Sequence, residues 1–286
     1  MNGYQQYIQG IVGLVETARS VALGNLPPAS NPPVAKDAPC ALFFAPHPDD
    51  ECISGGIALR LRREARMNVL NVAVTQGSNQ ARQAGRLREL QEACAFIGFG
   101  LLTTGPAGLE RINPKTRQTD PAHWSDCVQV IAEILRAHQP RVVMFPHEQD
   151  WNSTHIGTHY LLTDALLQMP ASFECLVIES EFWGQMDDPN LMLEISPEDL
   201  ADMVAATTFH VGEVARNPYH LLLPAWMMDN VRRGGELVGG QGGAAPNFLF
   251  ASLYRLRKWS AGQLTRFYEG GRNVPAGANL QTALCL

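Results

Sequence analysis

Short apolar segments alternate with helical patterns between residues 40 and 180, and this alternation is the feature that most constrains the fold. Strand and helix following one another at this pace indicate right-handed βαβ units and parallel strands. The sequence therefore predicts an α/β fold: a Rossmann-like, mostly parallel sheet with helices on both faces, in a single domain with an irregular C-terminal part. The predicted strands are 40–45, 68–75, 99–103, 141–145 and 175–180, and the predicted helices are 54–66, 82–97, 124–138 and 156–167.

The two ends of the chain lack this regular alternation. Residues 1–36 are predicted to form an N-terminal helix and a Pro-rich linker, because apolar side chains recur at helical spacing over 4–23 and four prolines follow. Such a helix is expected to pack on the domain, which spans 37–286, or on a second subunit. Near the C-terminal end, 197–211 is predicted to be a helix, and the glycine-rich segment 232–246 to be a loop over the functional site.

Composition and charge favour a globular protein with a small-molecule partner. The 286 residues are 45% hydrophobic and 17% charged, which is ordinary for a folded domain. A formal net charge of −6 argues against nucleic-acid binding. The basic clusters 60–63 and 255–258 are interpreted as solvated faces or as contacts in a homo-oligomer.

Cysteine usage and hydropathy indicate the cellular compartment. The six cysteines are scattered without a Cys-x-x-Cys pair, so we expect buried free thiols in a reducing environment. No apolar window is long enough for a membrane span, and the N-terminus lacks the pattern of a signal peptide. These features predict a cytoplasmic protein.

A cluster of ionisable side chains follows the first predicted strand, in the run Ala45-Pro46-His47-Pro48-Asp49-Asp50-Glu51. Burying four such groups together is costly unless their charge is compensated, and a divalent metal would compensate it. Pro48 fixes its own φ and biases His47 away from helix, so that the loop can turn its side chains toward one point. A turn followed by a capped helix start, with Asp50 or Ser54 as the N-cap, is the plainer alternative.

A second polar segment, residues 147–159, follows the strand predicted at 141–145. Ser153 or Thr154 could cap the next helix, which would place His155 in its first turn. Because ligands bind beyond the carboxyl ends of parallel strands, both segments are expected at the same edge of the sheet. We therefore predict a metal site formed by His47, Asp50 and His155, with His159 as the alternative to His155. Asp49 beside it would act as general base toward a water activated by the metal.

These motifs resemble those of the PIG-L/LmbE-like zinc-dependent N-acetylglucosaminyl deacetylases. The resemblance covers roughly residues 40–183 and is carried by His47-Pro48-Asp49-Asp50-Glu51, Thr75-Gln76-Gly77, Arg86-Leu87-Arg88-Glu89-Leu90, Ala93, Gly98 and His155. It implies a Rossmann-like fold, zinc on His47, Asp50 and His155, and Asp49 as the base. It also implies that Arg86 contacts sugar hydroxyls and that the reaction removes an acetyl group from an N-acetylglucosamine-type sugar.

One position departs from the family pattern. The family's second motif commonly has the sequence His-Pro-Asp-His, whereas this chain has Asn152-Ser153-Thr154-His155. Asn152 can donate a hydrogen bond to an oxyanion but cannot supply a proton. Either Asp49 carries the proton alone, or His220 or His159 assists. A buried structural role is the alternative for His220, and packing one turn along the helix is the alternative for His159.

The sequence thus predicts a zinc-dependent hydrolase that removes the acetyl group from an N-acetylated amino sugar or glycoconjugate, with iron(II) as the alternative metal. Two other functions remain open: an amidase acting on a larger acyl or thiol conjugate, and a non-catalytic protein of the same fold that binds a sugar or a metal. Among the remaining histidines, His147 is expected to support a ligand or simply to end a strand. His123, His138 and His210 are assigned structural or surface roles.

Overall fold

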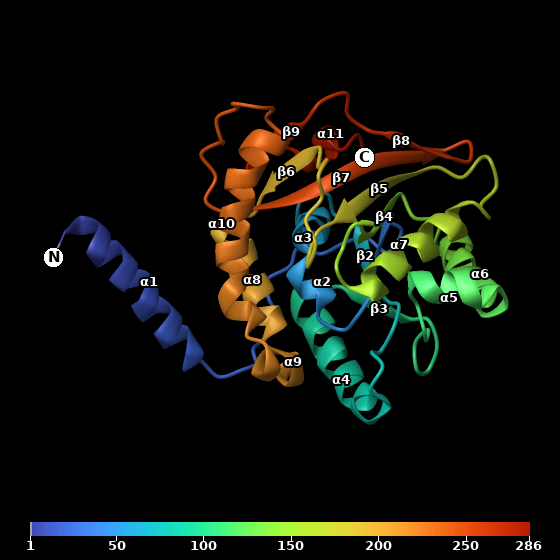
Figure 1. The fold of residues 1–286 in the computed structure, drawn as a ribbon, viewed down its shortest axis with the longest axis horizontal. Coiled ribbons are helices and arrows are strands. Elements are labelled where there is room, and N and C mark those ends of the chain that lie inside the picture. The colour runs from blue at the N-terminus through green and yellow to red at the C-terminus, as the bar shows by residue number, and fades with distance from the viewer. Residues whose placement is uncertain (1) are drawn as a thin grey trace.

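A nine-stranded mixed sheet forms the centre of the protein (Figure 1). The structure, a computed structural model, describes residues 2–286. Its strands are β1 (Cys40–Ala45), β2 (Asn68–Ala73), β3 (Gly100–Thr103), β4 (Val142–Pro146), β5 (Cys175–Ser180), β6 (Leu191–Glu194), β7 (Ala251–Ser260), β8 (Gln263–Arg266) and β9 (Arg272–Val274). They are arranged in the order β3-β2-β1-β4-β5-β7-β6-β9, with β8 paired to β7. Strands β1 to β5 are mutually parallel, whereas β7 is antiparallel to β5, β6 and β8.

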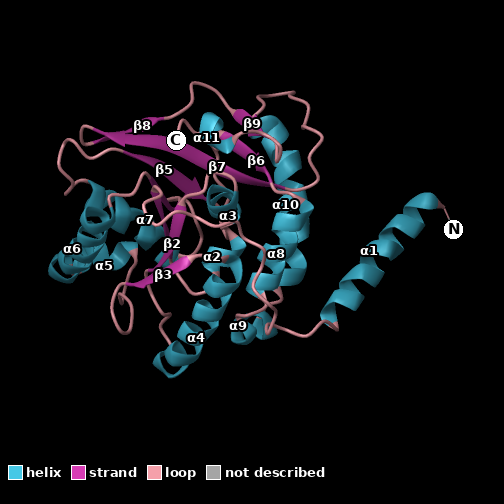
Figure 2. Ribbon diagram, turned by 180° about the vertical axis from the view of Figure 1, so that it is seen from behind, coloured by secondary structure: helices cyan, strands magenta, loops and turns pink. Residues whose placement is uncertain are grey.

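Helices cover both faces of the sheet, as Figure 2 shows, so the predicted fold class is confirmed. The helices are α1 (Gly3–Arg19), α2 (Asp50–Ile53), α3 (Gly56–Arg63), α4 (Gln80–Ile97), α5 (Pro114–Thr119), α6 (Pro121–His138), α7 (Ser153–Leu166), α8 (Pro197–Thr207), α9 (Val211–Arg216), α10 (Tyr219–Leu237) and α11 (Leu280–Ala283). Side chains of β1 alternate between two cores: Ala41 and Phe43 pack with α3, α4, α8 and α10, whereas Leu42 and Phe44 pack with α6 and α7. This period of two on a strand buried from both sides explains its uninterrupted apolar sequence.

The strand order reverses between β1 and β4. From β1 the chain proceeds to β2 and then β3 on one side, and it returns to place β4 on the other side of β1. In open α/β sheets such a reversal leaves a crevice at the carboxyl ends of the two strands, where ligands bind. The loops after β1 and β4 are the two segments that the sequence marks as rich in potential ligands, so the topology brings them to one place.

The C-terminal part, whose sequence pattern is irregular, continues the same sheet. Strand β7 is ten residues long and pairs with β5, β6 and β8. The segment 232–246, predicted to be a loop over the functional site, begins as helix, since α10 extends to Leu237. A Cβ on Gly234 would lie 2.5 Å from Met192 Sδ, so this glycine serves close helix–sheet packing. The loop prediction is wrong for 232–237, and residues 238–246 do not line the cavity described below.

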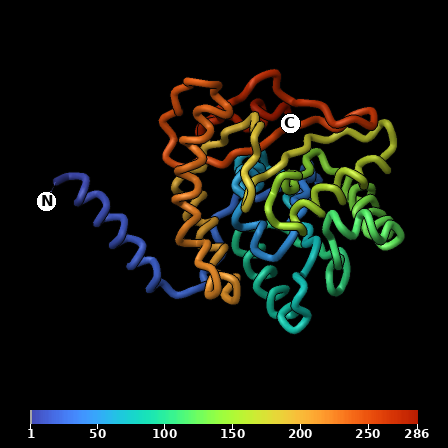
Figure 3. The backbone as a smooth tube through the Cα atoms, in the orientation of Figure 1, coloured from blue at the N-terminus to red at the C-terminus, as the bar shows by residue number. Residues whose placement is uncertain are grey.

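The N-terminal helix α1 projects from the body of the protein (Figure 1). Its start is capped by Asn2, and none of its residues is buried. Helix α1 comes near α10 but buries no residue there, so packing on its own domain or on a second subunit stays a prediction. The linker does contact the body, because Gly24 N–H donates to Thr208 Oγ1 at 3.0 Å, and Figure 3 shows the chain meeting the body beside the orange segment.

No helix within residues 2–286 combines the length and the apolar character needed to cross a membrane.

The two basic clusters, 60–63 and 255–258, each contain a buried arginine, contrary to their interpretation as solvated faces. Arg60 is fully buried, and its guanidinium donates to Glu64 Oε1 at 2.6 Å and to the Glu194 carbonyl at 2.9 Å. Arg255 is likewise buried and donates to Glu179 Oε2 at 2.6 Å. A guanidinium can be buried where carboxylates and carbonyls satisfy its planar set of donors. For these two residues the solvated-face interpretation is wrong.

All six cysteines are free thiols, as predicted. Four are buried, Cys40 is half-buried and Cys285 is exposed. Burial raises the pKa of Cys40 to about 11 and that of Cys175 to about 12, so both thiols are protonated near neutral pH.

Candidate metal site and active-site cavity

The loop after β1 brings His47 and Asp50 together. Pro46, His47 and Pro48 lead from the strand into the short helix α2, which begins at Asp50. The backbone N–H of His47 donates to Asp50 Oδ2 at 2.9 Å, and His47 Nδ1 lies 3.4 Å from the same oxygen. The tight turn therefore presents one imidazole and one carboxylate side by side.

The loop after β4 supplies a third group. Asn152 caps α7, accepting the Thr154 N–H on its Oδ1 at 2.8 Å, and this cap places His155 in the first turn. His155 Nε2 lies 3.3 Å from Asp50 Oδ2, and the rings of His47 and His155 are 5.3 Å apart between centroids. Each of these three residues offers a ligand atom within 4.8 Å of the other two. The structure thus brings together the three predicted ligands.

Features of His155 fit a bound divalent metal. Its ring is 1% exposed, and neither ring nitrogen has a hydrogen-bond partner. Nδ1 lies 3.6 Å from Asp150 Oδ2, whose carboxylate accepts the backbone N–H groups of Trp183 and Gly184. A carboxylate behind the second nitrogen is the usual support of a metal-bound histidine. Two imidazoles and a carboxylate are also a donor set suited to zinc or iron(II).

Charges at this point also favour a cation. Burial would lower the pKa of His155, but the carboxylates of Asp50 and Asp150 outweigh it and raise the pKa to about 10. Burial would raise the pKa of Asp50, yet His155 and His47 hold it below its usual range. The pair of carboxylates therefore stabilises a positive charge where a metal would place one.

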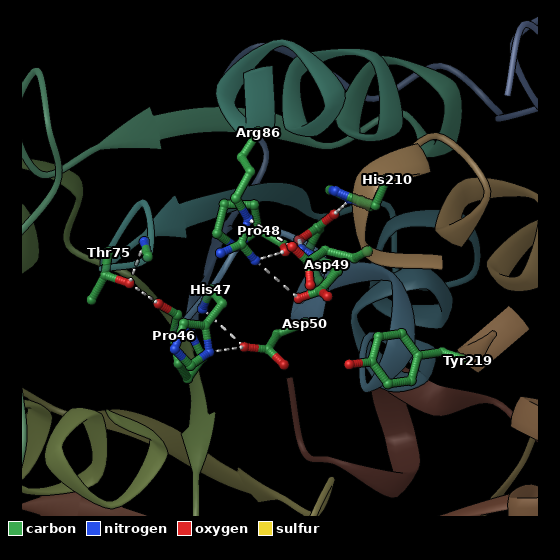
Figure 4. Close-up of polar contacts among 12 residues, drawn as sticks. Pro46, His47, Pro48, Asp49, Asp50, Thr75, Arg86, His210 and Tyr219 are labelled. Carbon is green, nitrogen blue, oxygen red and sulfur yellow. Dashed lines mark hydrogen bonds and ion pairs between the residues drawn. The ribbon is translucent and has the colours of Figure 1, made fainter. Parts of the chain in front are cut away.

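Asp49, the predicted base, lies beside this cluster. Burial and the neighbouring charge of Asp50 raise its pKa well above the usual range. Its carboxylate Oδ1 is 4.0 Å from Arg86 Nη2, and the side chain faces the cavity (Figure 4). A carboxyl with a raised pKa is suited to take up a proton and release it within one reaction.

Arg86 of α4 also faces this cavity. Its Nη2 donates to the Pro48 carbonyl at 2.9 Å, and its Nε lies 3.6 Å from Glu213 Oε1. Gly77, with φ of 82°, makes room for the guanidinium, because a Cβ there would collide with Arg86 Nη1. Gly77 and Arg86, which both belong to the family resemblance, therefore pack against each other, and the glycine leaves space for the guanidinium.

The cavity has a volume of about 530 Å³ and opens beside the three predicted ligands. One side is aromatic, with Trp183 and Tyr219 in edge-to-face contact at 5.6 Å between ring centroids. Tyr219 turns its hydroxyl toward Asp50 (Figure 4). The other sides are polar. The lining residues beyond those already described include Gln83, Leu109, Arg111, Ile112, Asn113, Phe182 and Arg216.

Of the other two predicted site residues, Asn152 lines the cavity and His220 does not. Asn152 lines the cavity, and its Oδ1 is used in the helix cap, so its amide N–H₂ remains as a donor. His220 is buried with Nδ1 unpartnered and does not line the cavity, whereas the adjacent Tyr219 does. His147 supports the loop that carries Trp183, because its Nε2 lies 2.9 Å from the Gly184 carbonyl.

Sequence reasoning overlooked Asp150, Glu213 and Tyr219. A signal existed for Asp150, a carboxylate five residues before a predicted histidine ligand. No spacing rule points to Glu213 and Tyr219, because they come from helices that follow the strand–helix alternation. His210, assigned a structural or surface role, is fully buried and contacts Glu51, next to the predicted ligands.

Together, the parallel sheet, the reversal of strand order and the His-Asp-His cluster define an α/β protein with a candidate metal centre at the switch point. Residues 42–166 match the sequence model of the PIG-L family, described as GlcNAc-PI de-N-acetylase. This match contains every predicted metal ligand, and the resemblance to the PIG-L/LmbE-like family is thereby confirmed. Comparison with curated proteins gives no match.

Solved structures share the fold at low identity. The N,N'-diacetylchitobiose deacetylase from Pyrococcus horikoshii is 16% identical with a TM-score of 0.57, covering 94% of this chain and 98% of that one. A deacetylase of the teicoplanin biosynthesis pathway is 16% identical, with a TM-score of 0.55 over 77% of this chain and 98% of its own. GalB, the 4-carboxy-2-hydroxymuconate hydratase from Pseudomonas putida KT2440, is 16% identical, with a TM-score of 0.56 over 76% and 95%. Because this fold carries a hydratase as well as deacetylases, the reaction has to be argued from the site.

Proposed function

We propose that this protein is a metal-dependent N-deacetylase that acts on an N-acetylated amino sugar or on a glycoconjugate bearing one. The observation that carries the proposal is the convergence of His47, Asp50 and His155, with both ring nitrogens of His155 buried and unpartnered. The match to the PIG-L family and the deacetylases among the structural neighbours support the choice of reaction.

His47, Asp50 and His155 would hold the metal, for which we propose zinc, with iron(II) as the alternative. A divalent metal bound there would lower the pKa of water and polarise the acetyl carbonyl. The protein's own contribution begins with Asp49, which removes a proton from the attacking water. Because burial and Asp50 raise its pKa, Asp49 can hold that proton and then deliver it to the leaving nitrogen.

The oxyanion that develops on the acetyl group requires hydrogen-bond donors. Asn152, which lines the cavity, offers its free amide N–H₂, and the Tyr219 hydroxyl turns toward Asp50 (Figure 4). Since an asparagine cannot supply a proton, Asp49 is assigned the transfer to the amine.

The cavity lining supports a sugar as the substrate. The aromatic faces of Trp183 and Tyr219 suit the apolar faces of a pyranose ring, and the opposite polar residues, Arg86 among them, suit its hydroxyl groups. A volume of about 530 Å³ accommodates more than one sugar ring or a sugar with part of a conjugate.

The test is acetate release by the zinc-loaded protein from N-acetylglucosamine and from a panel of N-acetylated glycoconjugates. We expect Asp49→Ala to keep its zinc while turnover falls by roughly 10² or more, the scale of general-base catalysis. Full activity in Asp49→Ala would contradict the mechanism. Release of a larger acid, with no acetate, would instead identify an amidase acting on larger acyl groups, and saturable sugar binding without turnover would identify a binding protein.

A further inference from the structure

Asp49 has an unusual backbone conformation, with φ of 120° and ψ of −28°. The other six non-glycine residues with positive φ within 2–286 lie between 42° and 57°, in the ordinary left-handed region. Asp49 lies outside that region, where a side chain costs of order 1–3 kcal/mol. Such a conformation persists only if the surrounding structure holds it in place.

Both polar groups of the Pro48–Asp49 peptide are held by charged side chains. The Pro48 carbonyl accepts a hydrogen bond from Arg86 Nη2 at 2.9 Å. The N–H of Asp49 donates to Glu51 Oε2 at 2.9 Å. These two hydrogen bonds hold the carbonyl and the N–H at opposite edges of one peptide group and so fix its orientation. The orientation of this peptide in turn sets the φ angle that directs the Asp49 carboxylate.

Each of the two holding side chains is itself paired with a residue between α8 and α10. Glu51, fully buried, accepts from His210 Nε2 on its other oxygen at 2.6 Å. Arg86 Nε lies 3.6 Å from Glu213 Oε1, an ion pair without a hydrogen bond, and the Glu213 carboxylate also accepts from Arg82 and Arg216. Figure 4 shows Asp49 between Arg86 and His210. His210 immediately precedes α9, whose first turn carries Glu213, so one short segment supports both sides of the peptide.

We propose that His210 and Glu213 are positioning residues for Asp49: acting through Glu51 and Arg86, they hold the Pro48–Asp49 peptide so that the Asp49 carboxylate faces the cavity. Neither residue lies in the segment 42–166 that matches the PIG-L family. Without His210, Glu51 Oε1 would keep only the Cys52 thiol as a donor, and the buried carboxylate would turn or take up water, releasing the Asp49 N–H. The catalytic consequence rests on the proposed function, whereas the backbone consequence does not.

The kinetic test compares His210→Leu, His210→Gln and Glu213→Gln in the zinc-loaded enzyme, using the N-acetyl sugar that the wild type turns over best. We expect kcat of His210→Leu to fall roughly 10²-fold, the cost of misplacing a reacting group by about 1 Å, with KM within about threefold. Zinc content should stay stoichiometric. His210→Gln, whose amide can donate the same hydrogen bond to Glu51, should recover most of kcat, and Glu213→Gln should show a smaller loss than His210→Leu.

Asp199→Asn is the matched control. It removes the 2.6 Å ion pair between Asp199 and Arg63, one of two by which Arg63 joins α8 to the body, without reaching the Pro48–Asp49 peptide. A merely structural role for His210 would make His210→Leu resemble this control, with stability lowered and kcat unchanged. That outcome, or equal losses in His210→Leu and His210→Gln, would overturn the proposal.

Crystal structures provide a readout that does not depend on activity. In His210→Leu we expect φ of Asp49 to move from 120° toward negative values, and in His210→Gln to remain near 120°. If His210→Leu cannot be folded, Glu213→Gln carries the test, through a displaced Arg86 and Pro48 carbonyl. If the wild type hydrolyses none of the sugars, the proposed function fails, and the φ of Asp49 in these variants still decides the positioning role.

Discussion

His155 and His159 lie one turn apart on α7, and each meets two carboxylates, yet their surroundings differ. The carboxylates near His155 are Asp50 and Asp150, and the ring nitrogens of His155 have no hydrogen-bond partner. Around His159 the carboxylates are Glu148 and Glu179. The three potential metal ligands within 4.8 Å of one another are His47, Asp50 and His155 in the first group, and Glu148, His159 and Glu179 in the second.

The difference lies in the source of positive charge. Arg255 forms ion pairs with both Glu148 and Glu179, and Arg257 Nε lies 3.0 Å from Glu179 Oε2. His159 also has a hydrogen-bond partner, the Pro146 carbonyl at 3.2 Å from Nδ1. Buried carboxylates need a compensating cation, and guanidinium groups already supply it around His159. Within residues 2–286, no guanidinium forms an ion pair with Asp50 or Asp150, which favours a metal beside His155.

The largest expected effect separates the two histidines by metal binding. His155→Ala should lower zinc affinity by more than about 100-fold, because loss of a ligand exceeds the loss caused by an outer partner. His159→Ala should leave the affinity within about threefold of the wild type. Zinc bound after dialysis against a buffered zinc solution measures both. Stoichiometric zinc in His155→Ala would remove the distinction between the clusters.

A smaller effect concerns Arg255, which pairs with the carboxylates around His159. Arg255→Ala should lower the free energy of unfolding by about 3 kcal/mol, since Glu179 stays buried with only part of its pairing. Zinc affinity should be unchanged. Arg232→Ala, which removes an exposed pair with Asp229, serves as the control and should cost less than about 1 kcal/mol. Urea denaturation measures the free energy of unfolding of both variants. If Arg255→Ala and Arg232→Ala lose the same amount, Arg255 does not stabilise the protein by neutralising buried carboxylates.

The smallest effect is a pH dependence. Burial would raise the pKa of Glu148, but Arg255 outweighs it and lowers the pKa to about 2. A carboxyl whose pKa is depressed by folding stabilises the protein above its unfolded pKa and loses that stabilisation as the pH falls toward 2. Because Glu148 is partly exposed to solvent, we expect about 1 kcal/mol. In metal-free protein, the free energy of unfolding falls between pH 6 and pH 3. This fall should be about 1 kcal/mol smaller in Glu148→Gln than in the wild type. An identical drop would contradict the assignment.

The sequence predicts the central part of the fold because local pattern and tertiary structure agree there. The predicted strand 40–45 coincides with β1, and its apolar residues are required by cores on both faces. The segments with ligand-type residues meet because parallel strands end at one edge of a sheet. Pattern alone failed at Gly234, where a close contact with Met192 keeps glycine inside a helix, and at Arg60, where carboxylate and carbonyl acceptors permit burial.

The rest of the site depends on contacts that spacing does not encode. Trp183 and Tyr219 form one side of the cavity, but they come from a loop and a helix far apart in the sequence. His210 contacts Glu51 across 159 positions of the chain. A lone buried histidine has no pattern of its own, and only the packing of α8 against α2 and α4 shows what it faces.

The potential ligands come from residues 47–155, whereas the aromatic side of the cavity comes from residues 182–219. On the proposed function, the predicted metal ligands and the aromatic contacts to a substrate therefore lie on separate stretches of the chain, although Arg86 of the first stretch also lines the cavity. On the proposed function, we expect that exchanging 182–209 and 214–219 between relatives, while retaining His210 and Glu213, changes the aromatic side of the cavity and leaves the predicted metal ligands in place.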